Sequence, residues 1–545
     1  MTNQSTVAAR TIVEHLLAAG VKHVVVAPGS RSAPLSYAFA QAASAGLVTL
    51  HVRIDERDAG FLALGLAKAS GLPVPVVVTS GSAVANLLPA VVEAHYSGIP
   101  LVVLAADRPA SARDRRAPQT ITQADIFGAF VNGGHADIAP DADVNAVIEA
   151  VLNEQGVHAG PIHLNVQFDM PLMPDDESWI PQVKRIEPVE RVTTHTRELL
   201  MVPAHGVILV GDVNDREATC EISQLGDDLG WPIIWETSAN VHGARTALSH
   251  GVLLLPHMPT PDVVISIGAA GLSRATGKLL QSTSHHIAVH LDSDGPEVPD
   301  MFGTADSILN AIPQATNDKD VQWLALWQQA DAKAADVVAM NLSAQTLTGP
   351  SAAIQLWNHV ADDSALMVSA SWPVRHIEAF APARSGVRVF GNRGANGIDG
   401  LISTAWGIAC EAAERNYLLI GDVAFLHDMS GLNVAEGQPQ PNLTIVVLDN
   451  DGSGIFSQLE QGAPQYAKHY EEVFGTPHGR DLWVVAESLG VPAKRVTTRD
   501  ELDRALAMAD RIGGVSVIVC TTGNRADENA LITRIKSEVA LALAD

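Results

Sequence analysis

The sequence predicts an α/β protein of three doubly wound domains with mainly parallel sheets. Three observations support this fold class. The chain has 545 residues, which is more than one hydrophobic core usually serves, and 47% of them are hydrophobic. Short runs rich in Val and Ile alternate with longer helical stretches from one end of the chain to the other. These runs are continuously apolar, as expected for parallel strands that are buried on both faces.

Eight of these runs are predicted to be strands. They cover residues 23–27, 74–79, 101–105, 206–210, 262–268, 417–422, 443–449 and 515–521. Two candidate domain boundaries interrupt the alternation of strands and helices. The first is a segment rich in proline and acidic residues at 171–177, and the second is a stretch at 313–350 that ends in Thr-Gly-Pro. We therefore expect three domains, at 1–180, 190–340 and 346–545.

The composition excludes several classes of protein. The formal net charge is −26 and the pI is near 5.1, which opposes binding to the phosphate backbone of nucleic acid. The three cysteines lie far apart, without zinc spacing or a disulfide framework, as in a reducing compartment. The sequence shows neither a signal peptide nor an apolar run of about 18 residues. We expect a cytoplasmic protein with no membrane span and no nucleic-acid partner.

Two polar residues follow neighbouring predicted strands in the third block. Asp422 and Asn450 are 450 − 422 = 28 positions apart, and open α/β sheets bind ligands at the carboxyl ends of strands. Mg²⁺ takes oxygen ligands, here the Asp422 carboxylate, the Asn450 amide oxygen and the Gly452 carbonyl, and shares them with phosphates. The pattern predicts a Mg²⁺ (or Mn²⁺) ion that holds a diphosphate. Two ordinary turns remain the alternative, because Gly-Asp and Asn-Asp-Gly are common turn sequences.

This arrangement resembles the thiamine diphosphate enzymes, and the resemblance implies thiamine diphosphate as the cofactor. Their usual build is three α/β domains, for the pyrimidine, the middle of the subunit and the diphosphate, and the whole chain fits that layout. A glutamate of the first domain is implied to hydrogen-bond the pyrimidine, and Glu56, after a predicted strand at 48–52, is the candidate. The alternative is a surface acid at a helix start that pairs with Arg53 or Arg57.

Local motifs narrow the resemblance. They are Ala-Pro-Gly-Ser-Arg-Ser-Ala-Pro-Leu at 27–35, Thr-Ser-Gly-Ser-Ala-Val-Ala-Asn at 79–86, Asp-Arg-Pro at 107–109, Asn-Arg-Gly-Ala-Asn-Gly-Ile-Asp-Gly at 392–400 and Phe-Gly-Thr-Pro-His at 474–478. They are similar to the family of 2-succinyl-5-enolpyruvyl-6-hydroxy-3-cyclohexene-1-carboxylate synthases. The middle block is similar mainly in layout. Asp451, Pro118 and Ser82 depart from the family pattern without removing a required group.

The resemblance implies a set of site residues, each at a matching motif position. Those implied to contact the cofactor or its metal are Glu56, Ser80, Gly81, Asp422, Asn450, Gly452 and Ile455. Those implied to contact substrate are Ser30, Arg31, Arg108, Gln119, Ser371, Arg375, Arg393, Phe456 and Leu459, with Arg274 and Lys278 as two alternatives for a further basic contact. The implied catalytic residues are Glu56, Ser371, Arg393 and Ile455, of which Ile455 bends the cofactor. Histidines such as His376 and His478 receive no role, because a structural histidine is commoner.

The implied reaction joins 2-oxoglutarate to isochorismate. It removes CO2 from 2-oxoglutarate and adds the resulting succinyl carbanion equivalent to isochorismate, in menaquinone biosynthesis. Both substrates are dianions, and the implied arginines lie in loops rich in glycine and proline, where the planar guanidinium can pair with carboxylates. The resemblance also implies self-association as a homodimer or homotetramer, with each site completed by two subunits.

Three other functions remain as alternatives. Another thiamine diphosphate-dependent 2-oxoacid decarboxylase or carboligase would share the metal loop, although the flavin of acetohydroxyacid synthase has no fingerprint here. A non-catalytic regulatory or binding protein of the same fold would not need Glu56, Asp422 and Asn450. A nucleotide-linked, transhydrogenase-like protein would need a Gly-x-Gly-x-x-Gly turn, which the sequence lacks.

Overall fold

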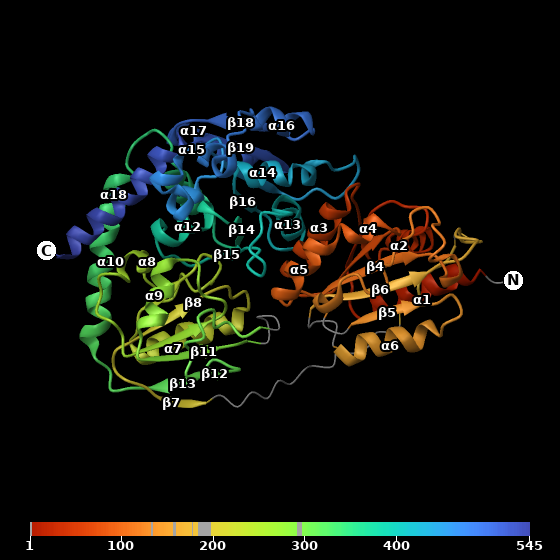
Figure 1. The fold of residues 1–545 in the computed structure, drawn as a ribbon, viewed down its shortest axis with the longest axis horizontal. Helices are drawn as coiled ribbons and strands as arrows, with labels where there is room; N and C mark the ends of the chain where they lie inside the picture. The colour runs from red at the N-terminus through yellow and green to blue at the C-terminus, as the bar shows by residue number, and fades with distance from the viewer. Residues whose placement is uncertain are drawn as a thin grey trace. The chain divides into compact units, whose positions relative to one another are not determined.

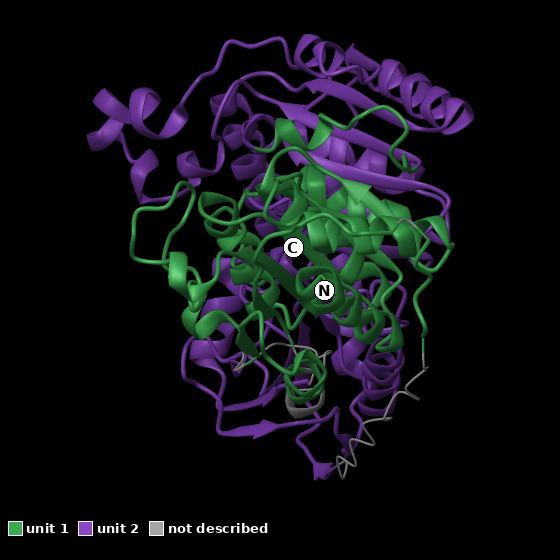
Figure 2. Cartoon of the chain, turned by 90° about the vertical axis from the view of Figure 1, so that its right-hand side faces the viewer, with its two compact units in different colours: residues 1–192, 394–412, 428–441 green, residues 193–393, 413–427, 442–545 purple. Residues whose placement is uncertain are grey.

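A computed structural model of the chain describes residues 3–131, 134–155, 160–176, 178–183, 198–291 and 297–544, with the side chains of 152–155 excepted. The chain forms two compact units (Figure 2). Unit 1 comprises Met1–Val192, Gly394–Ala412 and Asp428–Pro441, and unit 2 comprises Thr193–Arg393, Ala413–His427 and Asn442–Asp545. The division into three domains stays a prediction. Its first boundary, at 180–190, lies largely outside the described residues, as does residue 177 of the segment rich in proline and acidic residues.

Unit 1 is built on a six-stranded parallel sheet with the strand order β2-β1-β3-β4-β6-β5. Figure 1 shows its strands β4, β6 and β5 side by side. The strands are β1 (His23–Val26), β2 (Thr49–Val52), β3 (Val74–Val78), β4 (Leu101–Asp107), β5 (His135–Ile138) and β6 (Ile162–Gln167). The helices are α1 (Gln4–Ala18), α2 (Ala33–Ser44), α3 (Glu56–Ser70), α4 (Ser82–Ala85), α5 (Leu88–Tyr96), α6 (Val144–Gln155) and α13 (Leu401–Glu411). A core of Val, Leu, Ile and Ala lies between the sheet and helices α1, α2 and α6.

Helices α3 and α13 of unit 1 pack with their backbones in close contact. A Cβ atom at Gly65 would lie 2.1 Å from the carbonyl oxygen of Thr404, and one at Gly407 would lie 2.4 Å from that of Leu62. Only glycine permits this approach at either position. This packing fixes the helix whose first residue is Glu56.

Unit 2 contains two larger parallel sheets and one small pair of strands. The first sheet has the order β12-β11-β10-β8-β9, the second has the order β15-β14-β16-β17-β19-β18, and β13 pairs with β7. The strands of the first sheet and the pair are β7 (Leu199–Met201), β8 (Gly206–Val210), β9 (Ile233–Trp235), β10 (Val263–Ile267), β11 (His285–Val289), β12 (Ser307–Leu309) and β13 (Gln314–Thr316). Those of the second are β14 (Ser364–Val368), β15 (Val387–Phe390), β16 (Asn416–Gly421), β17 (Leu443–Asp449), β18 (Ala493–Val496) and β19 (Val515–Thr521).

The α-helices of unit 2 lie between and after these strands along the chain. They are α7 (Arg216–Leu229), α8 (Gly251–Leu254), α9 (Arg274–Ser282), α10 (Val321–Asn341), α11 (Gly349–His359), α12 (Trp372–Phe380), α14 (Asp422–His427), α15 (Ala467–Tyr470), α16 (Leu482–Ser488), α17 (Arg499–Ile512) and α18 (Arg525–Ala544). No helix among the described residues is long and apolar enough to cross a membrane.

The predicted fold class is confirmed. All eight predicted strands are present, each within two residues of the predicted bounds, and they belong to parallel sheets. Strands β3, β8, β10 and β14 are buried at every position, as their continuous apolar sequences indicate. The sheet of unit 1 and the second sheet of unit 2 share one strand order, which reverses at β1/β3 and at β14/β16 respectively. Such a reversal is where doubly wound sheets open a crevice for ligands.

Candidate active site

The predicted metal loop lies at the carboxyl edge of the second sheet of unit 2. Strands β16 and β17 pair in parallel with Gly421 opposite Leu448, so Asp422 and Asn450 follow neighbouring strands at one edge. The Asp422 side chain is buried, and one of its oxygens accepts hydrogen bonds from the N–H groups of Asn450 (3.2 Å) and Gly452 (2.8 Å). The structure therefore brings the three predicted ligand residues together.

The donor set of this loop fits a divalent cation that carries a diphosphate. The Asn450 amide oxygen is buried, and within the described part of the chain it has no hydrogen-bond partner. An orphaned oxygen of this kind is rare in a folded protein and is suited to a metal. Gly452 has φ 133°, and a Cβ atom there would lie 2.2 Å from the carbonyl oxygen of Gly475, so the loop can close only with glycine.

Two further residues, which sequence reasoning did not assign, complete the acidic cluster. His478 Nε2 lies 3.3 Å from an Asp422 carboxylate oxygen and 3.7 Å from Asp449, and the candidate ligand atoms of the three residues lie within 4.8 Å of one another. The hydrogen bond to Asp422 raises the pKa of His478, and burial followed by the charge of Asp422 raises the pKa of Asp449. This crowding of negative charge is what a divalent cation relieves. His478 closes the Phe-Gly-Thr-Pro-His motif, which was the available signal.

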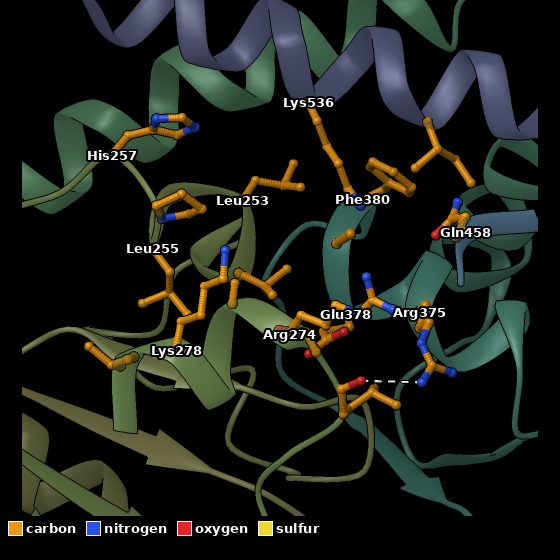
Figure 3. Close-up of a pocket in the computed structure, with 18 of the residues that line it drawn as sticks. Leu253, Leu255, His257, Arg274, Lys278, Arg375, Glu378, Phe380, Gln458 and Lys536 are labelled. Carbon is orange, nitrogen blue, oxygen red and sulfur yellow. Dashed lines mark hydrogen bonds between the residues drawn. The ribbon is translucent and has the colours of Figure 1, made fainter. Parts of the chain in front are cut away.

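A cavity of about 770 Å³ in unit 2 contains several of the predicted substrate contacts. Its lining includes Arg274, Lys278, Arg375, Ile455 and Leu459. Figure 3 shows Arg274 and Arg375 at one end of the cavity, whereas Lys278 approaches from another wall beside Leu255. Arg274 and Lys278, the two alternatives for the further basic contact, thus line the same cavity.

Ser371 and Arg375 are joined by a strained turn that follows strand β14. Ser371 has φ 73°, a left-handed conformation that is uncommon for a residue other than glycine and that often marks functional sites. Arg375 donates to the carbonyl oxygen of Ser371 (2.8 Å) and to that of Leu272 (3.2 Å), which orients its guanidinium at the cavity wall. Burial lowers the pKa of Arg375, whereas the negative charge of Glu378 raises it.

Arg393 lies outside the lining of this cavity, as do Ser371 and Phe456. Its side chain is 13% exposed, and its guanidinium lies 3.8 Å from the carboxylate of Glu236. The Phe456 ring packs 5.5 Å from that of Phe474, beside the short helix Ile455–Gln458 that carries the predicted wedge residue. Ile455 itself is partly buried against the core of unit 2.

A buried carboxylic acid in the cavity was not predicted from the sequence. Glu378 lies on α12, one turn after Arg375, and is 5% exposed. Burial, reinforced by the charge of Glu236, raises the pKa of Glu378 well above its ordinary value. Glu378 thus adds a buried acid to the cavity wall that also carries Arg274 and Arg375.

Glu56 is placed in unit 1 at the start of α3. Asp55, not Glu56, caps the helix, and Glu56 is half-buried with its carboxylate accepting from Asn86 Nδ2 at 3.3 Å. Arg57 pairs with Asp55, and the Arg53 guanidinium lies over the Trp406 ring. Because both arginines have these other partners, the surface ion-pair interpretation of Glu56 loses its support.

The other predicted residues of unit 1 gather at the carboxyl ends of β1, β3 and β4. Arg108 donates to the Ser80 hydroxyl (3.0 Å) and to the Gln119 carbonyl oxygen (2.8 Å), and Ser80 donates to that same carbonyl. Gly81 has φ 86°, and a Cβ atom there would lie 3.0 Å from the Gln119 side chain. The structure therefore brings Ser80, Gly81, Arg108 and Gln119 together.

Arg31 belongs to this cluster, and Ser30 precedes it as an exposed residue. Arg31 donates to the Phe168 carbonyl oxygen at 2.9 Å. Burial lowers the pKa of Arg31, and the neighbouring charge of Arg108 acts in the same direction. Two like charges held this close favour an anionic ligand between or beside them.

Comparison with known proteins decides the family. Residues 6–126 match the N-terminal TPP binding domain of thiamine pyrophosphate enzymes, and residues 378–520 match the C-terminal TPP binding domain. A curated protein of Nocardioides sp. is 39% identical over 98% of this chain and 98% of its own length. One of Nocardia farcinica is 36% identical over 99% and 100%, and one of Saccharopolyspora erythraea is 37% identical over 99% and 100%. All three are named 2-succinyl-5-enolpyruvyl-6-hydroxy-3-cyclohexene-1-carboxylate synthase.

The chain belongs to this synthase family. It thus carries both cofactor-binding domains of a thiamine diphosphate enzyme, and the cofactor is thiamine diphosphate with a divalent metal ion. The matched regions contain Glu56, Ser80 and the Asp422 loop. Residues 127–377, which carry Arg274, Lys278, Ser371 and Arg375, lie outside both matched regions. The roles of individual residues remain predictions.

Proposed function

We propose that the chain removes CO2 from 2-oxoglutarate and adds the remaining succinyl unit to isochorismate. The product is 2-succinyl-5-enolpyruvyl-6-hydroxy-3-cyclohexene-1-carboxylate, made for menaquinone biosynthesis. The observation that carries this proposal is the similarity to synthases of that name, at 36–39% identity over 95% or more of the chain. The basic side chains that line the unit 2 cavity add support, because both proposed substrates are dianions; they are Arg274, Lys278, Arg375 and Lys536.

In this proposal the cation is bound by the Asp422 carboxylate, the Asn450 amide oxygen and the Gly452 carbonyl. When bound, thiamine diphosphate supplies the carbon nucleophile and the electron sink for decarboxylation. Glu56, Ser80 and Gly81 would hold its pyrimidine end, and Ile455 would pack against it. His478 orients Asp422 and lies beside Asp449 as well.

The substrate contacts act through charge and exclusion of water. Arg31, Arg108, Arg375 and Arg393, with Arg274 or Lys278, bind carboxylates, which fixes the substrate next to the reacting centre. Phe456 and Leu459 form apolar walls that reduce access of water. The net charge of −26 does not oppose this, since salt screens charges beyond about 8 Å while the arginines lie at the site itself.

We also propose that the chain works as a homodimer or homotetramer. The residues proposed for the pyrimidine end lie in unit 1 and those for the metal in unit 2, and the family resemblance implies that two subunits complete each site. Sedimentation of the active enzyme should give a dimer or larger. A fully active monomer would contradict this assembly.

The proposed location is the cytoplasm, without a nucleic-acid partner. Support comes from the acidic charge and from three cysteines that are free, of which Cys220 is exposed. An exposed thiol without a partner is typical of a reducing compartment.

An omission assay tests the proposed reaction. The complete mixture contains 2-oxoglutarate, isochorismate, thiamine diphosphate and Mg²⁺, and the coupled product and CO2 are both measured. Loss of the product on omission of any one component is expected. Release of CO2 at an undiminished rate without isochorismate would favour a simple 2-oxoacid decarboxylase. No turnover of the complete mixture would favour a non-catalytic protein of the same fold.

A further inference from the structure

Glu236 is a buried carboxylate to which neither the sequence motifs nor the matched regions give a role. It follows strand β9 directly, at the carboxyl edge of the first sheet of unit 2, and is 2% exposed. It lies within residues 127–377, which neither family model matches. A charged side chain at this depth is costly unless other groups compensate it, so its contacts show what it does.

One oxygen of Glu236 binds the loop that leads to Arg274. It accepts hydrogen bonds from the N–H groups of Gly271 (2.6 Å) and Leu272 (2.5 Å). These two residues lie between strand β10 and helix α9, whose first residue is Arg274. Charge-assisted bonds of this length fix a loop more firmly than neutral ones do. Glu236 therefore fixes the loop that ends two residues before Arg274.

The other oxygen of Glu236 faces Arg393. The nearest guanidinium nitrogen is 3.8 Å away, and the side chains are 3% and 13% exposed, so the pair is shielded from water. Among the described residues this oxygen has no hydrogen-bond partner. Burial raises the pKa of Glu236 while the charge of Arg393 lowers it, as expected when a buried acid depends on one cation.

The same loop also binds the third arginine. The carbonyl oxygen of Leu272 accepts a hydrogen bond from Arg375 at 3.2 Å, the dashed line in Figure 3. The backbone of Leu272 thus donates its N–H to Glu236 and accepts from Arg375 with its carbonyl oxygen. Glu236 is connected to all three arginines: to Arg393 by charge, to Arg375 through the backbone of Leu272, and to Arg274 through the loop.

We propose that Glu236 is a positioning residue that holds Arg274, Arg375 and Arg393 in the arrangement that binds a dicarboxylate substrate. The inference rests on the proposed function, since it takes these arginines as carboxylate contacts. Like charges repel, and the buried carboxylate of Glu236, together with the charge of Glu378 beside Arg375, lowers the repulsion among these arginines. Glu236 does not itself touch substrate in this account.

The substitution Glu236→Gln tests the inference. The amide oxygen of glutamine can still accept from Gly271 and Leu272, but the negative charge toward Arg393 is lost. We expect the KM for at least one dicarboxylate substrate to rise by about 5- to 20-fold, the range for losing a charge-assisted contact, with kcat within about 2-fold. Glu501→Gln is the matched control, because Glu501 also accepts from two backbone N–H groups but caps α17 elsewhere in unit 2.

Two further measurements separate positioning from simple structural support. Calorimetric titration with glutarate, an unreactive dicarboxylate, should show weaker binding to Glu236→Gln than to the wild type, with an unchanged Tm. In a double-mutant cycle, the loss of glutarate affinity in the double variant should be little larger than the loss in Arg393→Ala alone. Each substitution already removes the pairing of Glu236 with Arg393. If Glu236→Gln does not fold, Glu236→Asp replaces it: the shorter side chain moves the carboxylate away from both the Gly271–Leu272 loop and Arg393, and the KM should rise for that reason.

The failures of the two proposals are distinguishable. Unchanged KM and glutarate affinity in Glu236→Gln, or effects that add fully to those of Arg393→Ala, overturn the role of Glu236 while the wild type remains active. A wild type that neither binds glutarate nor turns over 2-oxoglutarate overturns the proposed function instead.

Discussion

Glu56 lies at the first position of α3, where Asp55 already performs the capping that an acid at this position often provides. Its carboxylate therefore contributes little to the helix. Asn86 is its hydrogen-bond partner, in the segment that follows the Ser80–Gly81 turn. These contacts leave the Glu56 charge available for a cofactor.

We expect Glu56→Gln to lower kcat by at least about 100-fold, the scale of a missing proton-transfer group, and to leave the fold intact. Turnover of 2-oxoglutarate and the apparent Tm are the two measurements. Glu149→Gln, at an exposed position of α6, serves as the control and should be fully active. Near-normal turnover of Glu56→Gln would remove Glu56 from the mechanism.

Asp58 and Asp428 are two buried acids of unit 1. Asp58 accepts from the Ser430 hydroxyl (2.9 Å), and Asp428 accepts from the Ser403 N–H (2.8 Å). Burial, together with the charge of the partner acid or of Asp55, raises the pKa of Asp58 to about 6 and that of Asp428 to about 7. The folded state thus binds protons that the unfolded state, with a carboxyl pKa near 3.8, has released.

These raised pKa values make the folded protein less stable as the pH rises. The stabilisation from protonated Asp58 and Asp428 is complete below about pH 4 and is lost as the pH rises through about 6 and 7. We expect Asp428→Asn to flatten the fall in apparent Tm between about pH 5 and about pH 8, because the amide carries no charge at any pH. Thermal unfolding across this range measures it. An identical pH profile for the variant and the wild type would contradict the assignment.

At the scale of elements, the closest packing in unit 1 joins α3 to α13. A side chain at Gly407 would meet the Leu62 carbonyl oxygen, a backbone atom that cannot rotate away. We expect Gly407→Val to lower the apparent Tm by roughly 5 °C or more, from overpacking at the upper end of about 1–3 kcal/mol. Turnover should fall with it, because the shift moves the helix that begins at Glu56.

Ala507→Val is the control for the two methyl groups of valine, which it adds to an exposed position of α17. Its Tm should stay within the range of an ordinary surface change, about 0.5 kcal/mol. Equal effects of the two variants would mean that the contact between α3 and α13 is not the cause.

The sequence could predict elements whose signal is local. Each buried parallel strand is a continuous apolar run, and Asp422 and Asn450 stand directly after two such runs. The glycines at positions 65 and 407 carried no comparable signal, because their partners lie on another helix far along the chain. Strand ends could be predicted, whereas helix contacts between distant segments could not.

The site residues that were missed follow the same rule. His478 reaches Asp422 from 56 positions away, and Glu236 reaches Gly271 from 35. Before folding, an acid after a strand such as Glu236 is indistinguishable from an ordinary turn residue. Glu378 lacks a signal as well, because one acid on an amphipathic helix indicates a solvated face until burial is known.

At the scale of the whole molecule, the chain repeats one design in its two units. The sheet of unit 1 and the second sheet of unit 2 share a strand order, and each carries predicted site residues after the strands where that order reverses. In unit 1 these are Arg31 after β1 and Gly81 after β3. In unit 2 they are Ser371 after β14 and Asp422 after β16. The placement follows from topology, since the carboxyl ends of strands that diverge at a reversal leave room for a ligand.

The metal loop is the part of the molecule on which the account depends most. We expect the wild type to bind thiamine diphosphate in the presence of Mg²⁺ and to lose that binding when EDTA removes the ion. Asn450→Ala removes the orphaned amide oxygen and should weaken binding at least about 10-fold, the equivalent of about 1.4 kcal/mol. Asn310→Ala, an exposed asparagine of unit 2, should change nothing.

Calorimetric titration of thiamine diphosphate into these proteins, with and without Mg²⁺, is the most direct measurement. We expect the wild type and Asn310→Ala to bind thiamine diphosphate tightly and only with the metal present. We expect Asn450→Ala to bind it weakly. Equal affinity of all three proteins, or wild-type binding that persists after the metal is removed, would contradict these expectations.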